Sequence, residues 1–226
     1  MGEIIDFSSN GSNGQGYLAT PDSGSGPGVI VIQEWWGLVD HIKDVCDRFA
    51  SQGFVALAPD LYRGVVSAEP DEAGKLMMAM ALDRAAKDMS GAVDEVVKRS
   101  TSKGVGVIGF CMGGGLALAL ASQRSDKVLA VAPFYGAVPW PDFQPDYSKI
   151  NAAVQGHYAE LDDWMDPQKA RALESTLKDL GKQAEIIIHP GTQHAFFNDT
   201  RPEVYDKDAS EQAWTSVIEF FKIKLV

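Results

Sequence analysis

The chain has few cysteines and no long apolar segment. Two cysteines among 226 residues are too few for a disulfide framework, which favours a protein of a reducing compartment. No apolar run approaches the roughly 20 residues that a membrane-spanning helix needs. The first residues, MGEIIDFSSN, contain neither the basic segment nor the apolar segment of a signal peptide. We therefore expect a cytoplasmic protein without a membrane segment.

Positively charged residues are also scarce. The chain has 20 Lys and Arg residues against 31 Asp and Glu residues, which gives a net charge of −11. An acidic surface argues against nucleic acid and against anionic membranes as partners. No G-x-G-x-x-G sequence opens a strand–helix unit, and no Cys/His cluster has the spacing of a metal site. We expect no cofactor, no metal, a small molecule as partner, and a monomer.

Short apolar runs alternate with helical patterns along the chain. The runs are continuously apolar, as in strands buried on both faces, and they occupy residues 28–33, 54–59, 104–110, 128–136, 151–156 and 184–190. Helical patterns cover residues 38–51, roughly 71–99, 113–123, 167–181 and 204–224. This alternation predicts one α/β domain over residues 1–226, with a mostly parallel sheet and helices on both of its faces. The opening segments EIIDFSS and GQGYLATP predict a short antiparallel edge.

Cys111 follows one of these strands in the sequence GFCMGG, with Gly109 and Gly113 two residues to either side. The pattern G-x-C-x-G is that of a nucleophile elbow, with sulfur in place of the usual serine oxygen. Glycines are needed there because the sharp turn from strand to helix leaves no room for side chains. The start of the following helix favours a thiolate, and the backbone N–H of Met112 is expected to face a developing oxyanion. An inert buried cysteine in a glycine-rich turn is the alternative.

A thiol nucleophile needs a base, and the chain has only four histidines. His41 begins a polar helix and is expected to face solvent. His157 precedes an acidic loop, and His189 ends the last predicted strand, where we expect it to pack against the sheet edge. His194 lies in the loop after that strand, which fits the hydrolase order of nucleophile, acid and histidine. His194 is therefore the predicted base.

The acid that orients this base should follow the strand between Cys111 and His194. The segment NAAVQGHYAELDDWMDP offers several carboxylates there. Asp162 is the preferred candidate, because it lies just beyond the predicted strand, and Asp163 is the close alternative. Asp166 precedes Pro167 and has the pattern of a helix N-cap followed by proline at the first helical position.

Glu34 stands at the end of a buried strand, in the sequence QEWWG. A carboxylate in this place either caps backbone donors or belongs to the site. Trp35 occupies the loop that supplies the second oxyanion-hole N–H in such folds. Trp36 either covers the sheet edge with its aromatic ring or forms a wall of the pocket.

Together these segments resemble the dienelactone hydrolase (carboxymethylenebutenolidase) family of α/β-hydrolases. The resemblance runs across nearly the whole chain in family order and is carried by QEWWGL (33–38), APDLY (58–62), GFCMGG (109–114), FYG (134–136), the loop at Asp162 and GTQHAFF (191–197). The pairing of Q-E near the start with G-F-C-x-G-G in the middle is more specific than the elbow alone.

The resemblance implies an α/β-hydrolase fold and a Cys111–His194–Asp162 triad. It also implies that Glu34 interacts with the resting thiol and helps to activate it when substrate binds. Met112 and Trp35 would form the oxyanion hole. Trp36 and Tyr135 match aromatic positions of the family's pocket.

The substrate pocket departs from the family pattern. The family binds its substrate's carboxylate with arginines, one of them four residues after the catalytic histidine, and here that position is Asn198. Arg84 is out of register for the second arginine, while Arg63 and Arg201 are possible spatial substitutes. We therefore expect a lactone or a small activated ester as substrate. The alternatives are a non-catalytic homologue that binds a small molecule and a thiol redox sensor.

Overall fold

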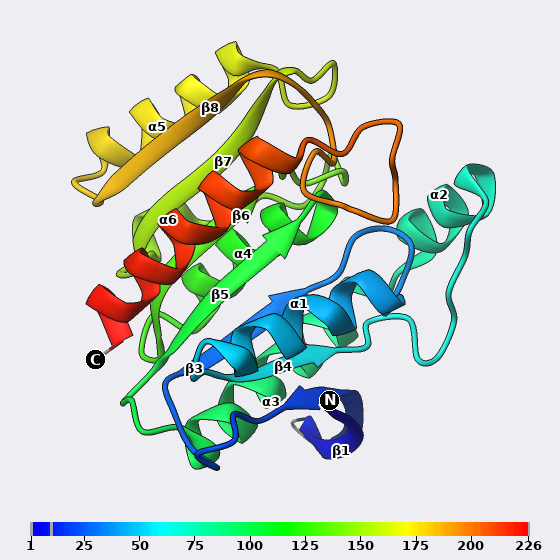
Figure 1. Ribbon diagram of the computed structural model, residues 1–226, viewed down its shortest axis with the longest axis vertical. Helices are drawn as coiled ribbons and strands as arrows, with labels where there is room; N and C mark the ends of the chain where they lie inside the picture. Colours follow the sequence, from blue (N-terminus) through cyan, green and yellow to red (C-terminus); the bar gives the residue numbers. More distant parts are fainter. Residues whose placement is uncertain (1, 10, 226) are drawn as a thin grey trace.

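An eight-stranded sheet forms the centre of the protein, whose computed structural model describes residues 2–9 and 11–225 (Figure 1). The strand order is β1-β2-β4-β3-β5-β6-β7-β8. The six strands from β4 to β8 in this order are parallel, and β1 and β2 add an antiparallel edge. The strands are β1 (Glu3–Ser9), β2 (Ser12–Ala19), β3 (Gly28–Ile32), β4 (Val55–Pro59), β5 (Val105–Phe110), β6 (Val128–Phe134), β7 (Ala153–Leu161) and β8 (Ala184–Gln193).

Helices cover both faces of the sheet, as the sequence predicts. One face carries α1 (Asp40–Ser51) and α6 (Lys207–Leu225), which lie in front of the sheet in Figure 1. The other carries α3 (Leu82–Arg99), α4 (Met112–Gln123) and α5 (Pro167–Asp179). The remaining helical elements are α2 (Pro70–Ala79) and a 3-10 turn at Tyr147–Lys149.

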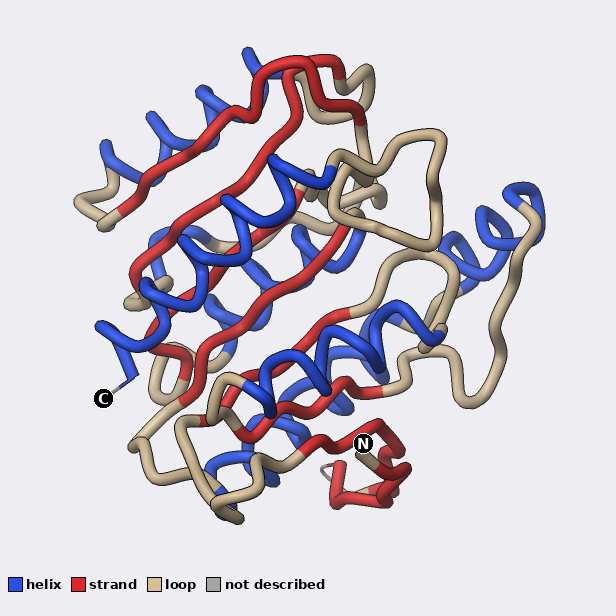
Figure 2. The backbone as a smooth tube through the Cα atoms, viewed as in Figure 1, coloured by secondary structure: helices blue, strands red, loops and turns tan. Residues whose placement is uncertain are grey.

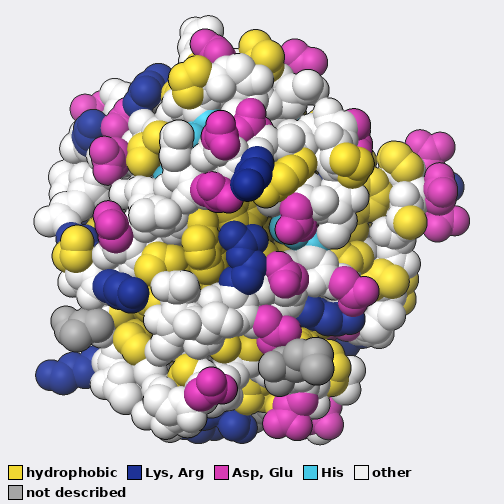
Figure 3. All heavy atoms as spheres, in the orientation of Figure 1, with side chains coloured by type: hydrophobic (Ala, Val, Ile, Leu, Met, Phe, Trp, Pro, Cys, Tyr) yellow, Lys and Arg dark blue, Asp and Glu magenta, His cyan; other side chains and the backbone are white. Residues whose placement is uncertain are grey.

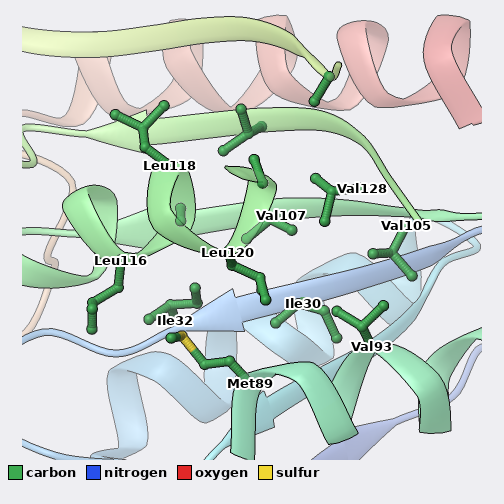
Figure 4. Close-up of a cluster of buried hydrophobic side chains, with 14 of the residues drawn as sticks. Ile30, Ile32, Met89, Val93, Val105, Val107, Leu116, Leu118, Leu120 and Val128 are labelled. Atoms are coloured by element: carbon green, nitrogen blue, oxygen red, sulfur yellow. The ribbon is translucent and has the colours of Figure 1, made fainter. Parts of the chain in front are cut away.

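Two apolar clusters, one on each face of the sheet, hold these layers together. In β3, Ile30 and Ile32 belong to the cluster under α3 and α4, whereas Val29 and Val31 belong to the cluster under α1 and α6. Figure 4 shows the first cluster, where side chains of β3 and β5 meet those of α3 and α4. Successive strand residues point to opposite faces, so a strand buried on both sides must be apolar throughout. This is why continuous apolar runs identified the central strands.

The single helical pattern predicted over residues 71–99 is wrong, since two helices occupy it. The chain leaves helical geometry at Met80, whose ψ of 128° is extended, and α3 begins at Leu82. α3 lays an apolar stripe on the sheet, whereas α2 buries only Ala73 and projects from the body of the protein (Figure 1). Acidic side chains gather on this projecting end (Figure 3), and the first turn of α2 holds Asp71 and Glu72.

The carboxyl ends of the parallel strands meet along one edge, where long loops gather (Figure 2). From β3 the chain passes to β4 on one side of it and then to β5 on the other, so β3 and β5 flank a topological switch point. Ligands of open α/β sheets bind in the crevice outside such a point. At the neighbouring strands, β7 and β8 run further than predicted, and Leu161 pairs with Gln193 at their ends. The next residues, Asp162 and His194, are thereby neighbours.

Two buried histidines lie side by side in β7 and β8. His157 Nδ1 is 3.0 Å from His189 Nε2, and His157 Nε2 is 3.4 Å from Gln155 Oε1. The amide oxygen can only accept, so His157 donates from Nε2 and accepts from His189 at Nδ1. Burial lowers the pKa of both histidines, and for His157 burial and the neighbouring His189 bring the pKa to about 3.

Because of this pair, we expect the protein to lose stability in mild acid. Histidines in an unfolded chain titrate near pH 6.5. Below that pH the unfolded chain therefore binds more protons than the folded chain, in which the histidine pair stays neutral. For His157, the free energy of unfolding should then fall by roughly 1.4 kcal/mol per pH unit as the pH drops from about 6.5 toward 3. Urea unfolding of His157→Asn between pH 7 and 5 should give a shallower decline than the unsubstituted chain. Equal declines would contradict the assignment.

Candidate active site

The backbone turns sharply at Cys111, between β5 and α4. Cys111 has φ 56° and ψ −124°, a conformation that costs a non-glycine residue on the order of 1–3 kcal/mol. The glycines let neighbouring chain segments approach closely. A methyl group on Gly109 would collide with the Gly113 carbonyl, and one on Gly113 would lie 2.5 Å from the Gln33 carbonyl oxygen. The Cys111 N–H donates to the Phe134 carbonyl at 3.1 Å, which fixes the turn against β6.

His194 and Asp162 are in contact at the carboxyl ends of β8 and β7. His194 Nδ1 is 2.7 Å from Asp162 Oδ2. The other carboxylate oxygen accepts the N–H groups of Trp164 and Met165, at 2.8 and 3.0 Å. Asp162 is buried, whereas its alternative Asp163 is exposed. Three hydrogen bonds therefore fix the Asp162 carboxylate, which in turn orients the imidazole.

The charges around His194 favour its protonated form. Burial by itself lowers the pKa of His194, but hydrogen bonds and charge from Asp162 and Cys111 outweigh it and raise the pKa to about 10. The pKa of Asp162 is lowered despite burial, chiefly by its hydrogen bond to His194. Cys111 contributes to this rise in the pKa of His194, so its sulfur lies near the imidazole. Sulfur, imidazole and carboxylate thus follow one another in a series along the sheet edge.

Glu34 lies beside this series, because β3 and β5 are paired neighbours. Ile32 pairs with Gly109, so Glu34 and Cys111 each stand two residues beyond the same register position. Glu34 is 1% exposed, and its oxygens accept from the Tyr135 hydroxyl at 3.3 Å and from Asn198 Nδ2 at 2.8 Å. Burial and the charges of Glu34 and Cys111 raise the pKa of Tyr135 well above its usual value, so its hydroxyl remains a donor.

The two predicted oxyanion-hole residues follow the carboxyl ends of the neighbouring strands β5 and β3. Met112 is the first residue of α4, and Trp35 follows Glu34. The N–H groups of Trp35 and Met112 have no hydrogen-bond acceptor among the described residues. Amides in this state are available to an incoming oxygen.

A hollow of about 420 Å³ adjoins Asn198 and includes the two predicted pocket residues Trp36 and Asn198. Trp36 forms part of its wall, and the Arg201 guanidinium carbon lies 5.8 Å from the Trp36 ring centre. Arg201 also pairs with Glu203 at 2.8 Å. The hollow is lined by Trp36, Val39, Ser67, Ala68, Pro70, Asn198, Thr200, Arg201 and Glu203.

Not every candidate from the sequence reaches the site. Arg63 is bound to the buried Asp88 at 2.8 Å, and Arg84 is exposed on α3. The prediction that His41 faces solvent is wrong. The His41 side chain is buried, and its Nδ1 lies 3.3 Å from Asp199 Oδ1. It packs on the apolar side of α1 together with Val45, four residues later, rather than on the polar side.

Three residues near the site had no predicted role. Trp164 packs its edge against His194, with ring centres 5.4 Å apart. Tyr62 places its hydroxyl 3.5 Å from Met112 Sδ, and burial together with the Cys111 charge raises its pKa. Gln33 Oε1 accepts the Leu61 N–H at 3.1 Å, which joins the loops after β3 and β4. The last two stand in the motifs APDLY and QEWWGL, which are signals for their importance.

Within the described ranges 2–9 and 11–225, no group of three or more His, Cys, Asp or Glu side chains is arranged to hold a metal ion. No described helix is both long enough and apolar enough to cross a membrane.

Comparison with known proteins places the site in a wider context. Residues 15–225 match the model of the dienelactone hydrolase family. The chain is 38% identical to the protein usf of Aquifex pyrophilus, with 98% of each chain covered. It is 36% identical over the full length of both chains to an Aquifex aeolicus protein provisionally named carboxymethylenebutenolidase.

Solved structures share the fold at lower identity. The dienelactone hydrolase from Anabaena variabilis superposes with a TM-score of 0.73 at 19% identity, over 100% of this chain and 99% of that one. A dienelactone hydrolase-like promiscuous phosphotriesterase from metagenomic libraries superposes with a TM-score of 0.87 at 22% identity, with the same coverage. With the family model matched over residues 15–225, the chain belongs to the dienelactone hydrolase family of α/β-hydrolases.

Proposed function

We propose that the protein hydrolyses lactones or small activated carboxylic esters through an acyl-enzyme on Cys111. The observation that carries this proposal is the 2.7 Å contact between the His194 imidazole and the Asp162 carboxylate, beside the strained turn that holds Cys111 at the switch point. A nucleophile, a base within reach and a group that orients the base are the requirements of covalent acyl transfer.

In the first half of the reaction, the Cys111 thiolate attacks the carbonyl carbon and forms a C–S bond. The carbonyl electron pair moves to oxygen, where the Met112 and Trp35 N–H groups stabilise the charge. Collapse of this intermediate breaks the bond between the acyl carbon and the leaving oxygen. The His194 imidazolium gives its Nε2 proton to that oxygen, which leaves a thioester on Cys111 and a neutral imidazole.

In the second half, water attacks the thioester carbon while His194 Nε2 removes its proton. Collapse expels the Cys111 thiolate and releases the carboxylic acid, which restores the imidazolium–thiolate pair. Asp162 stays ionised throughout and keeps Nδ1 protonated. Every proton and electron pair is returned after one turnover, so this cycle consumes only water and the ester.

The choice of sulfur favours substrates with good leaving groups. A thiolate leaves more readily than an ordinary alkoxide, so its attack on an unactivated ester reverses before the ester bond breaks. Enol lactones and aryl esters avoid this reversal, because an enolate or a phenolate departs easily. The approach to the site adds selectivity through Trp36, Tyr135 and Asn198, which we propose as pocket residues.

A screen of lactones and aryl esters tests the proposal. For any substrate that is turned over, Cys111→Ala should lower kcat/KM by roughly a thousandfold or more, because the covalent route is lost. Cys46→Ala is the matched control, since Cys46 is buried in α1 away from the catalytic series, and it should retain turnover. Full activity of Cys111→Ala would refute the cysteine mechanism. Alkylation of Cys111 by iodoacetamide without turnover of any ester would favour the non-catalytic binding module.

The role of Asp162 can be read from the titration of His194. In the unsubstituted chain the imidazolium should persist as the pH rises and lose its proton only near pH 10. Asp162→Asn removes the hydrogen bond and the negative charge that raise this pKa, so the midpoint should fall by about one unit or more. NMR of the ring nitrogens measures the midpoint directly. Asp163→Asn is the matched control and should leave it unchanged, and an equal effect of both variants would contradict the assignment.

A further inference from the structure

Glu34 is a buried carboxylate that is held by two neutral donors. Asn198 Nδ2 binds one of its oxygens at 2.8 Å, and the Tyr135 hydroxyl lies 3.3 Å from the other. A buried carboxylate must be hydrogen-bonded to be tolerated, and neutral donors satisfy its oxygens without cancelling its charge. Glu34 therefore brings a negative charge to the crevice whose position depends on these two partners.

Asn198 has a fixed orientation, which makes it a precise donor. Its Oδ1 accepts the Thr200 N–H at 3.1 Å and the Thr200 hydroxyl at 2.6 Å. Because a backbone N–H can only donate, Oδ1 must face Thr200 and Nδ2 must face Glu34. Asn198 is 1% exposed, so the amide has no competing contact with solvent.

The backbone of Glu34 lies on the strand next to that of Cys111, so the side chain of Glu34 has the sulfur within its reach. Glu34 and Cys111 follow paired positions of β3 and β5, which lie about 4.8 Å apart in any sheet. The other ionisable groups around the carboxylate are Tyr135, whose pKa both anions raise, His194, which contacts the Tyr135 ring, and Arg201, whose charge acts on Tyr135 in the opposite direction. Movement of the Glu34 carboxylate toward Cys111 would disfavour a thiolate there.

We propose that Asn198 is a positioning residue that keeps Glu34 away from Cys111 and thereby leaves the Cys111 thiolate to pair with His194. The inference rests on the proposed function, because it concerns the activation of that nucleophile. In addition to lining the pocket, Asn198 then fixes the position of the Glu34 carboxylate. Loss of its amide would free Glu34 to turn toward the sulfur, and loss of the Glu34 charge would make Asn198 unnecessary.

A double-mutant cycle on alkylation of Cys111 tests this. The rate of labelling by iodoacetamide would be measured from pH 5 to 10 for the unsubstituted chain, Asn198→Ala, Glu34→Gln and the double variant. Asn198→Ala should slow labelling at pH 7 by roughly tenfold and move the profile to higher pH, as expected when a hydrogen bond to a charged group is lost. In the Glu34→Gln background the same substitution should change the rate by less than about twofold.

An equal loss in both backgrounds, or no loss in either, overturns the inference, because Asn198 would then act independently of Glu34. If Asn198→Ala does not fold, Thr200→Val takes its place in the cycle, since it removes the shorter of the two contacts that orient the amide. Its effect should have the same sign and again require Glu34. Labelling needs no ester, so failure of this cycle is distinct from failure of the hydrolysis screen with Cys111→Ala.

Discussion

The strained turn at Cys111 is the constraint on which the rest of the site depends. A residue with φ 56° and ψ −124° persists only where its surroundings leave no alternative. Here the neighbouring strands hold the turn in place: the Gln33 carbonyl lies where a side chain on Gly113 would be, and the Phe134 carbonyl accepts the Cys111 N–H. The apolar clusters on both faces of the sheet hold these strands in register, so the packing energy of the core is what keeps the sulfur raised at the sheet edge.

The pairing register of the parallel strands also places Asp162, His194 and Glu34 near the sulfur of Cys111. β7 and β8 end at paired residues, and the next residue of each strand carries the carboxylate or the imidazole of the Asp162–His194 pair. Glu34 arrives by the same principle from β3. Side chains that are far apart in sequence thus converge because parallel strands end along one edge. Hydrogen bonds then fix them: Asp162 binds its own loop, His194 binds Asp162, and Glu34 binds Tyr135 and Asn198.

The site brings the carboxylates of Asp162 and Glu34 together with the imidazole of His194 and the sulfur of Cys111. Asp162 raises the pKa of His194, and Cys111 adds to the effect, so the imidazole favours its protonated form. Glu34 is hydrogen-bonded by a neutral amide and a phenol. The amide belongs to Asn198, at the position where the resemblance to the family implies a substrate-binding arginine. The only described arginine that lines the adjoining hollow is Arg201, which is already paired with Glu203.

The sequence by itself determined the layered α/β fold, the elbow and the order of its candidate partners. It could do so because burial on both faces demands continuous apolar strands, and because the sharp turn demands glycines at fixed spacing. Only the tertiary structure shows that Asp162 and not Asp163 contacts His194, since this depends on where β7 ends against β8. The break between α2 and α3, the burial of His41, and the contact of Asn198 with Glu34 were likewise beyond the sequence. Each depends on a contact between one side of a helix or loop and a residue that is distant in the sequence. The local periodicity of the sequence does not specify such contacts.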